Sequence, residues 1–127
     1  MSPEGVIIRE SQYVVKETID RLQQFLQQHG VTIYARIDQQ AEVQKAGQNL
    51  RPLEFILFGN PKAGGPLMTE NPLVALDLPL KVIAWEDAQK KVWISYNDAR
   101  YIEDRYSILN RENTPLNLDL VIGKALN

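Results

Sequence analysis

The sequence predicts an α+β fold built around an antiparallel sheet. Apolar residues first recur at helical spacing after a short strand, and apolar and polar residues then alternate as they do along half-buried strands. In the second half, short hairpins rather than long crossovers join the predicted strands. The expected order of elements is β-α-β-β-β-β-α with two short helical insertions, in a single domain over residues 1–127.

The first helix is predicted from a stripe of apolar side chains that follows a short strand at residues 6–8. This stripe is widened by Phe25 and comprises Val15, Ile19, Leu22 and Leu26. We expect the helix to begin soon after Ser11 and to end at Gly30, because glycine readily adopts the left-handed conformation of a C-terminal cap. His29 is then a C-terminal helix residue, which suits the imidazole in the helix dipole.

Residues 31–37 alternate and predict a second strand with one wetter face. The drier face would carry Val31, Ile33, Ala35 and Ile37, and the wetter face Thr32, Tyr34 and Arg36. A short helix is expected over residues 38–46, with Asp38 as its N-cap and Gly47 as its stop. Residues 53–58 are mostly apolar and predict an interior strand.

Residues 59–66 concentrate glycine and proline and predict a loop, followed by a short helix at residues 67–76. Three glycines would let the backbone approach a ligand, and Lys62 would offer a cation to an anion. The loop matches neither phosphate-binding fingerprint, G-x-x-x-x-G-K-[ST] or G-x-G-x-x-G. A plain ordered turn is the alternative, since Asn-Pro and Gly-Gly-Pro suffice to explain one.

Residues 80–86 and 91–97 predict an antiparallel hairpin around a four-residue loop at residues 87–90. The expected partners are Trp85 with Val92, Ile83 with Ile94, and Lys81 with Tyr96, all on one face. Lys81 would then stand beside Tyr96 on an apolar surface and act as a ligand anchor or a base. The alternative is that Lys81 extends to water and pairs with Asp77. A register slip of one residue would separate Lys81 from Tyr96.

The other face of this hairpin is also apolar, so both faces of the hairpin need to be covered by other parts of the protein. Its residues are Val82, Ala84 and Trp93. An uncovered aromatic patch is typical of an interface or a ligand groove. Two further helices are expected, one over residues 99–109 and one at residues 117–127 that docks on the body of the domain or on a partner.

Charge and composition exclude several classes of function. Fourteen basic and sixteen acidic residues leave a net charge of −2, so we expect no nucleic-acid partner. The absence of cysteine excludes disulfides and thiolate chemistry, and the single histidine gives little support for a metal site. Neither a signal peptide nor a membrane span is predicted, and we therefore expect a cytoplasmic protein with no membrane partner. No particular cofactor is indicated.

Two blocks of residues resemble the bacterial domain-of-unknown-function family 302. The first runs from Leu50-Arg51-Pro52 through Glu54 to Phe58-Gly59-Asn60-Pro61-Lys62-Ala63-Gly64-Gly65-Pro66-Leu67-Met68. The second comprises Leu76-Asp77-Leu78-Pro79-Leu80-Lys81, Trp85-Glu86-Asp87, Val92, Tyr96-Asn97-Asp98 and Arg105. Members commonly carry His and Thr at the positions of Gln39 and Gly65, where this chain departs from the pattern.

The resemblance, which covers about residues 4 to 110, implies a fold similar to the TATA-binding-protein class. In that class helices pack on one side of a curved antiparallel sheet, and the family is usually met as a dimer. A shared fold does not carry DNA binding with it.

Three functions are compatible with these observations. The first is a homodimeric module that binds a small molecule or an anion, with candidate ligand-binding residues Asn60, Lys62, Gly64, Lys81 and Tyr96. The second is a cofactor-free enzyme that uses Lys81 or Tyr96 in proton transfer or as an electrophile. The third is a dimeric interaction protein whose apolar sheet face only joins subunits. The sequence identifies no catalytic residue and no metal ligand.

Overall fold

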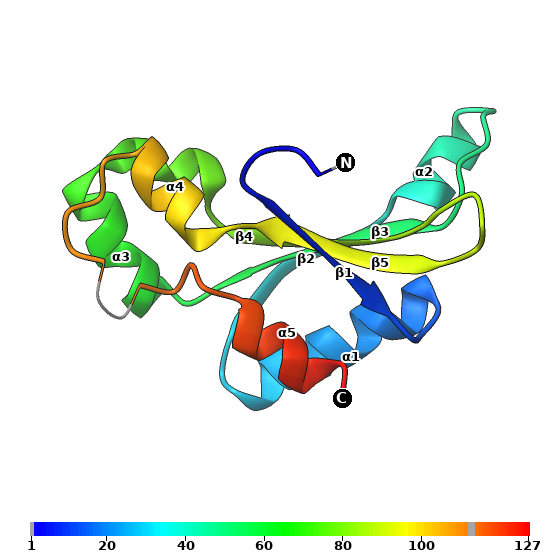
Figure 1. Ribbon diagram of the computed structural model, residues 1–127, viewed down its shortest axis with the longest axis horizontal. Coiled ribbons are helices and arrows are strands. Elements are labelled where there is room, and N and C mark those ends of the chain that lie inside the picture. The colour runs from blue at the N-terminus through cyan, green and yellow to red at the C-terminus, as the bar shows by residue number, and fades with distance from the viewer. Residues whose placement is uncertain (1, 112–113) are drawn as a thin grey trace.

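The computed structural model describes residues 2–111 and 114–127, in which a five-stranded antiparallel sheet carries helices on one side (Figure 1). The strand order is β1-β5-β4-β3-β2. The strands are β1 (Val6–Ser11), β2 (Thr32–Asp38), β3 (Leu53–Gly59), β4 (Leu80–Glu86) and β5 (Val92–Asn97). The helices are α1 (Val15–Gln28), α2 (Gln39–Lys45), α3 (Pro61–Glu70), the 3-10 helix η1 (Pro72–Asp77), α4 (Ala99–Arg105) and α5 (Asp119–Ala125). The predicted α+β class is confirmed.

The main core lies between the sheet and two helices, α1 and α5, which pack on the same side (Figure 1). The stripe predicted for α1 is buried there and comprises Val15, Ile19, Leu22 and Leu26. From α5, Ile122 and Ala125 join the same core. Gly30 follows α1 with a φ of +73°, the left-handed conformation expected at the end of this helix.

The opposite face of the sheet, which we call the open face, is formed by three rows of residues. The middle row is Ile8, Ser95, Ile83, Phe55 and Ile37. The row toward the β4–β5 turn is Glu10, Trp93, Trp85 and Leu53, and the row at the other end is Val6, Asn97, Lys81, Leu57 and Ala35. The open face is therefore mainly apolar, and α1 and α5 do not cover it.

Strand β2 departs from the regular alternation that the sequence predicts. Ile33 pairs with Phe58 and Ala35 pairs with Leu57, so Tyr34 is an extra residue in a β-bulge. From Ala35 onward, each residue of β2 therefore lies on the opposite face of the sheet from the one that regular alternation predicts. The prediction that Ile33 and Ala35 share a face was wrong, because Ile33 packs on the core whereas Ala35 lies on the open face.

Residues 59–66 do not form the predicted loop, because α3 begins at Pro61. The side-chain oxygen of Asn60 accepts a hydrogen bond from the N–H of Lys62 at 3.0 Å and so caps this helix. Proline suits the first helical position, where an N–H would have no partner in the helix. The helix predicted at residues 67–76 was therefore placed too late, and α3 and η1 occupy its position.

The pair Gly65-Pro66 lies inside α3, where proline usually breaks a helix. A proline ring collides with the Cβ of a preceding residue in helical conformation, and Gly65 has no Cβ. Together, α3, η1 and α4 enclose a smaller satellite cluster beside the main core. It comprises Leu67, Val74, Ile102, Tyr106, Ile108 and Leu116. Helix α4 ends at Arg105, earlier than the predicted residue 109.

The remaining short elements follow their local sequence. Helix α2 begins after Asp38, whose carboxylate accepts a hydrogen bond from the N–H of Ala41 at 2.9 Å, and Gly47 follows it with a φ of +82°. Both features were predicted. Across residues 2–111 and 114–127, the helices are all too short or too polar to span a lipid bilayer.

Candidate functional site

The predicted register of the β4–β5 hairpin was wrong by one residue. Val82, not Lys81, pairs with Tyr96, and Trp85 pairs with Trp93. Because neighbouring strand residues point to opposite faces, this slip places Lys81 on the open face and Tyr96 in the main core. A joint site of Lys81 and Tyr96 is therefore excluded.

Tyr96 is buried and serves the core. Its hydroxyl donates a hydrogen bond of 2.6 Å to the carboxylate of Asp119 at the start of α5. Arg9 donates to the backbone carbonyl of the same aspartate at 3.0 Å. Burial, reinforced by the hydrogen bond to Asp119, raises the pKa of Tyr96 to about 12. This phenol fixes α5 to the sheet and is poorly placed to act as a base.

Lys81 is exposed, and its ammonium lies 4.5 Å from the centre of the Phe55 ring. This is a cation–π contact with the adjacent strand. The predicted ion pair with Asp77 is absent from the described residues, because Asp77 accepts hydrogen bonds from Arg105, at 3.1 Å, and from the hydroxyl of Tyr106. Lys81 forms no ion pair with any residue that the structure describes.

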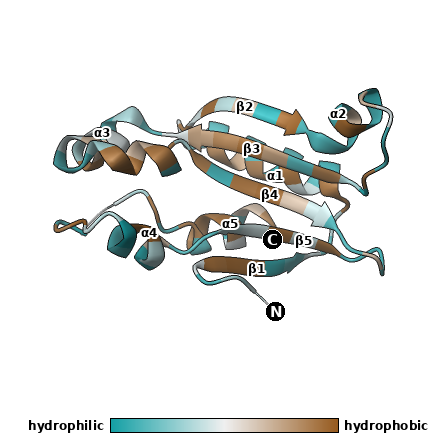
Figure 2. Ribbon diagram, turned by 90° about the horizontal axis from the view of Figure 1, so that it is seen from above, coloured by the Kyte–Doolittle hydropathy of each residue, from teal (hydrophilic) through white to brown (hydrophobic). Residues whose placement is uncertain are grey.

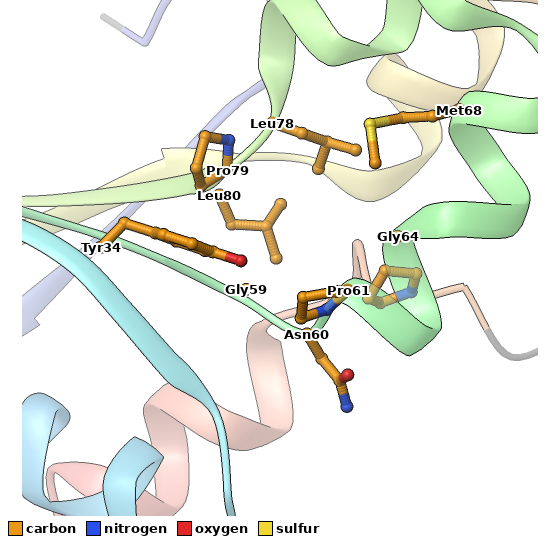
Figure 3. Close-up of a pocket in the computed structure, with 10 residues that line it drawn as sticks. Tyr34, Gly59, Asn60, Pro61, Gly64, Met68, Leu78, Pro79 and Leu80 are labelled. Carbon is orange, nitrogen blue, oxygen red and sulfur yellow. The ribbon is translucent and has the colours of Figure 1, made fainter.

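A compact cavity of about 160 Å³ lies where the ends of β2 and β3 meet α3 and the start of β4 (Figure 3). Its walls are mostly apolar. They comprise Tyr34, Gly59, Asn60, Pro61, Gly64, Met68, Leu78, Pro79, Leu80 and Pro115. We call this space the tyrosine pocket, because the ring of Tyr34 lies along it with the hydroxyl directed toward the other lining residues (Figure 3).

Two glycines and the β2 bulge create the tyrosine pocket. The Tyr34 ring lies over Gly59, where an added Cβ would come within 3.6 Å of the ring. An added Cβ on Gly64 would meet the ends of Leu78 and Met68, each at 3.9 Å. Figure 3 shows Leu78 and Met68 facing each other across this space. The missing side chain of Gly64 therefore leaves part of the pocket empty.

The five predicted ligand-binding residues do not come together. Asn60 and Gly64 line the tyrosine pocket, but the Asn60 side chain points away from its centre (Figure 3). Lys62 lies outside it on exposed α3 surface, and Lys81 and Tyr96 lie on opposite faces of the sheet. Sequence reasoning missed Tyr34, since the bulge that turns it toward the pocket has no distinct residue pattern.

Nothing in the described ranges gathers three or more histidine, aspartate or glutamate side chains that could hold a metal ion. His29 stacks on Phe25 and its ring nitrogen bonds to the carbonyl of Phe25 at 2.8 Å. That contact agrees with the helix C-terminal role predicted for His29.

Comparison with known proteins shows that this chain matches a family profile. The profile described as "Domain of unknown function DUF302" matches residues 7–119. The chain is also 38% identical over 104 residues to two Brucella proteins named "Fluoride-specific ion channel FluC 1", from B. suis biovar 1 (strain 1330) and B. abortus biovar 1 (strain 9-941). The match covers 82% of this chain but only 41% and 38% of those proteins. The chain thus spans about two fifths of the curated relatives it matches.

A solved structure shares the whole fold. The crystal structure of an uncharacterized conserved DUF302 protein from Bacillus stearothermophilus superposes with a TM-score of 0.77. The superposition covers 98% of this chain and 97% of that one, at 18% sequence identity. At this level of identity the likeness concerns the fold alone.

Proposed function

This chain belongs to the family described as domain of unknown function DUF302, and we propose that it is a small-molecule-binding module that forms homodimers. The observation that carries the proposal is the tyrosine pocket. It is a concave, largely apolar space with a single phenol hydroxyl directed into it, which is the usual character of a small-ligand site.

The size of the tyrosine pocket limits the ligand. An apolar cavity of about 150 Å³ holds one molecule of the size of benzene. The volume of about 160 Å³ therefore suits a six-membered ring or a short aliphatic group, either free or as the end of a larger ligand. Met68 adds an adaptable wall, because its thioether side chain is unbranched and polarisable.

One polar group in the pocket would orient such a ligand. The Tyr34 hydroxyl makes no hydrogen bond within the described part of the chain, and Tyr34 is 51% exposed. A ligand hydroxyl or carbonyl that meets it would gain a hydrogen bond without displacing an internal partner. Phenol combines the required ring with one such group and is the probe we would use.

The test is titration of the protein with phenol, followed by heteronuclear NMR and by thermal unfolding. Phenol should shift the amide signals around α3 and raise the melting temperature, since a ligand that binds only the folded state stabilises it. Gly64→Ala should weaken phenol binding several-fold and Gly64→Leu should abolish it, because each fills the space beside Leu78 and Met68.

Lys62→Ala is the matched control, as it lies on the same helix but outside the pocket. Phenol affinity should stay within twofold of wild type in this variant. Two results would show that the tyrosine pocket is not the site. One is an equal loss of phenol affinity in Lys62→Ala and Gly64→Leu, and the other is phenol binding that survives Gly64→Leu. Tyr34→Phe should lower the affinity for phenol more than that for toluene.

The dimer is proposed from the open face. Two tryptophans, Trp85 and Trp93, lie 6.4 Å apart on it, and Ile8 at its edge is 37% exposed. An apolar face of this kind is typical of a contact surface. A second copy is the occupant we propose, because a two-fold contact between equal faces would set the apolar middle rows against each other.

Light scattering during gel filtration tests the dimer. Wild type should give twice the 14.5 kDa of one chain, and Ile8→Lys should shift the mass toward one chain. Val14→Lys is the control. Like Ile8, Val14 is an exposed β-branched residue, with 66% of its surface exposed, but it lies outside the open face. A wild-type mass of one chain at high concentration would contradict the proposal.

We also place the module in the cytoplasm. Its 127 residues include no cysteine, so folding does not depend on an oxidising compartment. The channel activity in the names of the Brucella proteins belongs to proteins about twice as long, and the binding proposal rests only on the segment that they share with this chain.

A further inference from the structure

A second cavity opens where strands β4 and β5 part. Their pairing stops at Val82 and Tyr96, whereas β4 remains paired with β3 as far as Leu80 and β5 with β1 as far as Asn97. Figure 2 shows the two strands diverging in the direction away from their hairpin. The cavity in this fork has a volume of about 350 Å³ and lies next to the tyrosine pocket.

Most residues around the fork cavity are apolar, although polar atoms supply about half of its accessible surface. They include Leu57 from the open face, Leu76 and Leu78 from the segment before β4, Ile102 from α4, and Leu116 and Leu118 from the C-terminal segment. Three polar side chains complete the lining, namely Asp77, Lys81 and Asn97. A ligand that fills this space would therefore combine an apolar body with a polar group that meets these three side chains.

The charges of the fork cavity favour an anion. Asp77 is the only carboxylate in the described lining, and it is already held by Arg105 and Tyr106. Lys81 has no carboxylate partner within the described residues, and its ammonium lies over the ring of Phe55. Asn97 on β5, with its neutral amide, lines the same cavity as Lys81 on β4. The cavity thus presents one uncompensated positive charge and an amide donor.

We propose that the fork cavity binds a monocarboxylate with an apolar body, such as a medium-chain fatty acid, with its carboxylate at Lys81 and Asn97. One ammonium and one amide match the two oxygens of a carboxylate. A phosphate group carries more charge and more acceptor oxygens and needs more donors than this cavity offers. The site is separate from the tyrosine pocket, although both share Leu78, Pro79 and Leu80 as a common wall.

Isothermal titration with octanoate, at low ionic strength, tests the proposal. Octanol is the matched probe, because it has the same apolar body and no charge. Octanoate should bind at least tenfold more tightly than octanol. Lys81→Met keeps the length of the side chain and removes the charge, and it should lower octanoate affinity at least tenfold while leaving octanol affinity within twofold.

Lys62→Met is the matched control variant, because Lys62 is an exposed lysine that does not line the fork cavity. It should retain octanoate affinity within twofold. Lys81→Arg should retain most of the octanoate affinity of wild type, and Asn97→Ala should lower that affinity severalfold. If Lys81→Met fails to fold, Lys81→Gln provides the same comparison with a smaller change in polarity.

Several outcomes would overturn the inference. These are the absence of octanoate binding to wild type, equal affinity for octanol and octanoate, and equal losses in Lys81→Met and Lys62→Met. Gly64→Leu separates the two sites, since it should abolish phenol binding and leave octanoate binding unchanged. Octanoate binding that is lost in Gly64→Leu but retained in Lys81→Met would assign octanoate to the tyrosine pocket instead.

Discussion

The two faces of the sheet are built from neighbouring residues of the same strands but differ in what covers them. One face packs on α1 and α5, and its residues are buried, as Ile56 and Tyr96 are. The other face carries Leu57, Lys81 and the two tryptophans, and these four residues are only partly buried or exposed. Neighbouring residues of a strand therefore have different roles. Those on the covered face stabilise the core, and those on the open face are available for binding. A register shift of one residue would exchange these roles.

Polar contacts on the two faces also differ. On the covered face, Arg36 joins Asp20 at 2.6 Å and Glu54 at 3.0 Å, which ties α1 to β2 and β3. Burial acts to lower the pKa of Arg36, but the hydrogen bonds to Asp20 and Glu54 outweigh it and raise that pKa. On the open face the polar contacts orient aromatic rings, as when Trp85 donates to Ser95 at 3.0 Å.

The largest expected difference between the faces lies in two adjacent residues of β3. Ile56→Ala should lower the free energy of unfolding by about 4 kcal/mol, because it leaves a cavity in a fully enclosed core. Leu57→Ala should lower it by about 1.5 kcal/mol, because Leu57 is only partly buried. Urea unfolding of both variants measures this difference. Equal losses would mean that the open face is as well covered as the core.

Tyr96→Phe tests the polar contact on the covered face. Loss of the hydrogen bond to the Asp119 carboxylate should lower the free energy of unfolding by about 2 kcal/mol at neutral pH. Wild type should also lose stability as the pH rises from 10 toward about 12, because the unfolded chain releases the phenol proton there and the folded chain keeps it. Subtracting the pH profile of Tyr96→Phe isolates this loss, and parallel profiles would contradict the pKa of Tyr96.

Ser95→Ala provides the matching test on the open face, one residue away in β5. It removes the acceptor for the indole N–H of Trp85 and should lower the free energy of unfolding by about 1 kcal/mol. Tryptophan fluorescence should change along with it, since the ring would lose its fixed orientation. A loss larger than that of Tyr96→Phe would reverse the ranking of the two faces.

The smallest effect is expected at the hairpin turn beside the open face. The hydrogen bond from the Trp93 indole holds the pKa of Asp87 below its ordinary value. This contact stabilises the fold above the ordinary pKa of aspartate, and the contribution disappears as the pH falls through the lowered pKa. Asp87→Asn keeps an acceptor but cannot titrate, so its stability should depend less on pH below about pH 4. Identical acid profiles for the two proteins would contradict this.

The buried stripe of α1 could be predicted from the sequence, whereas the register of the β4–β5 hairpin could not. Helical spacing located the buried stripe of α1, because burial against a sheet requires that spacing. The β4–β5 turn was read as four residues, but Lys90 takes a left-handed φ of 65° and shortens it to three. Glycine usually marks such a position, so a lysine there gives no signal.

The candidate sites were only partly predictable. The sequence singled out the glycine-rich stretch after β3 as a candidate site, yet it was read as a loop because glycine and proline break most helices. Asn60 before Pro61 was the overlooked signal, since this pair is typical of a helix start. The fork cavity depends on where β4 and β5 separate, and no local residue pattern marks that point.

Because of the bulge at Tyr34, the number of residues in β2 determines the shape of the tyrosine pocket as well as the pairing of the sheet. Residues before the bulge and residues after it are out of phase, and this offset lets Tyr34 reach the pocket while Arg36 still reaches Glu54. Deleting one residue between Ile33 and Arg36 would bring the two halves back into phase and remove Tyr34 from the pocket, even if every other strand kept its pairing. A one-residue deletion at this point would thus act on binding, whereas the same deletion after Gly47 would shorten only a connection.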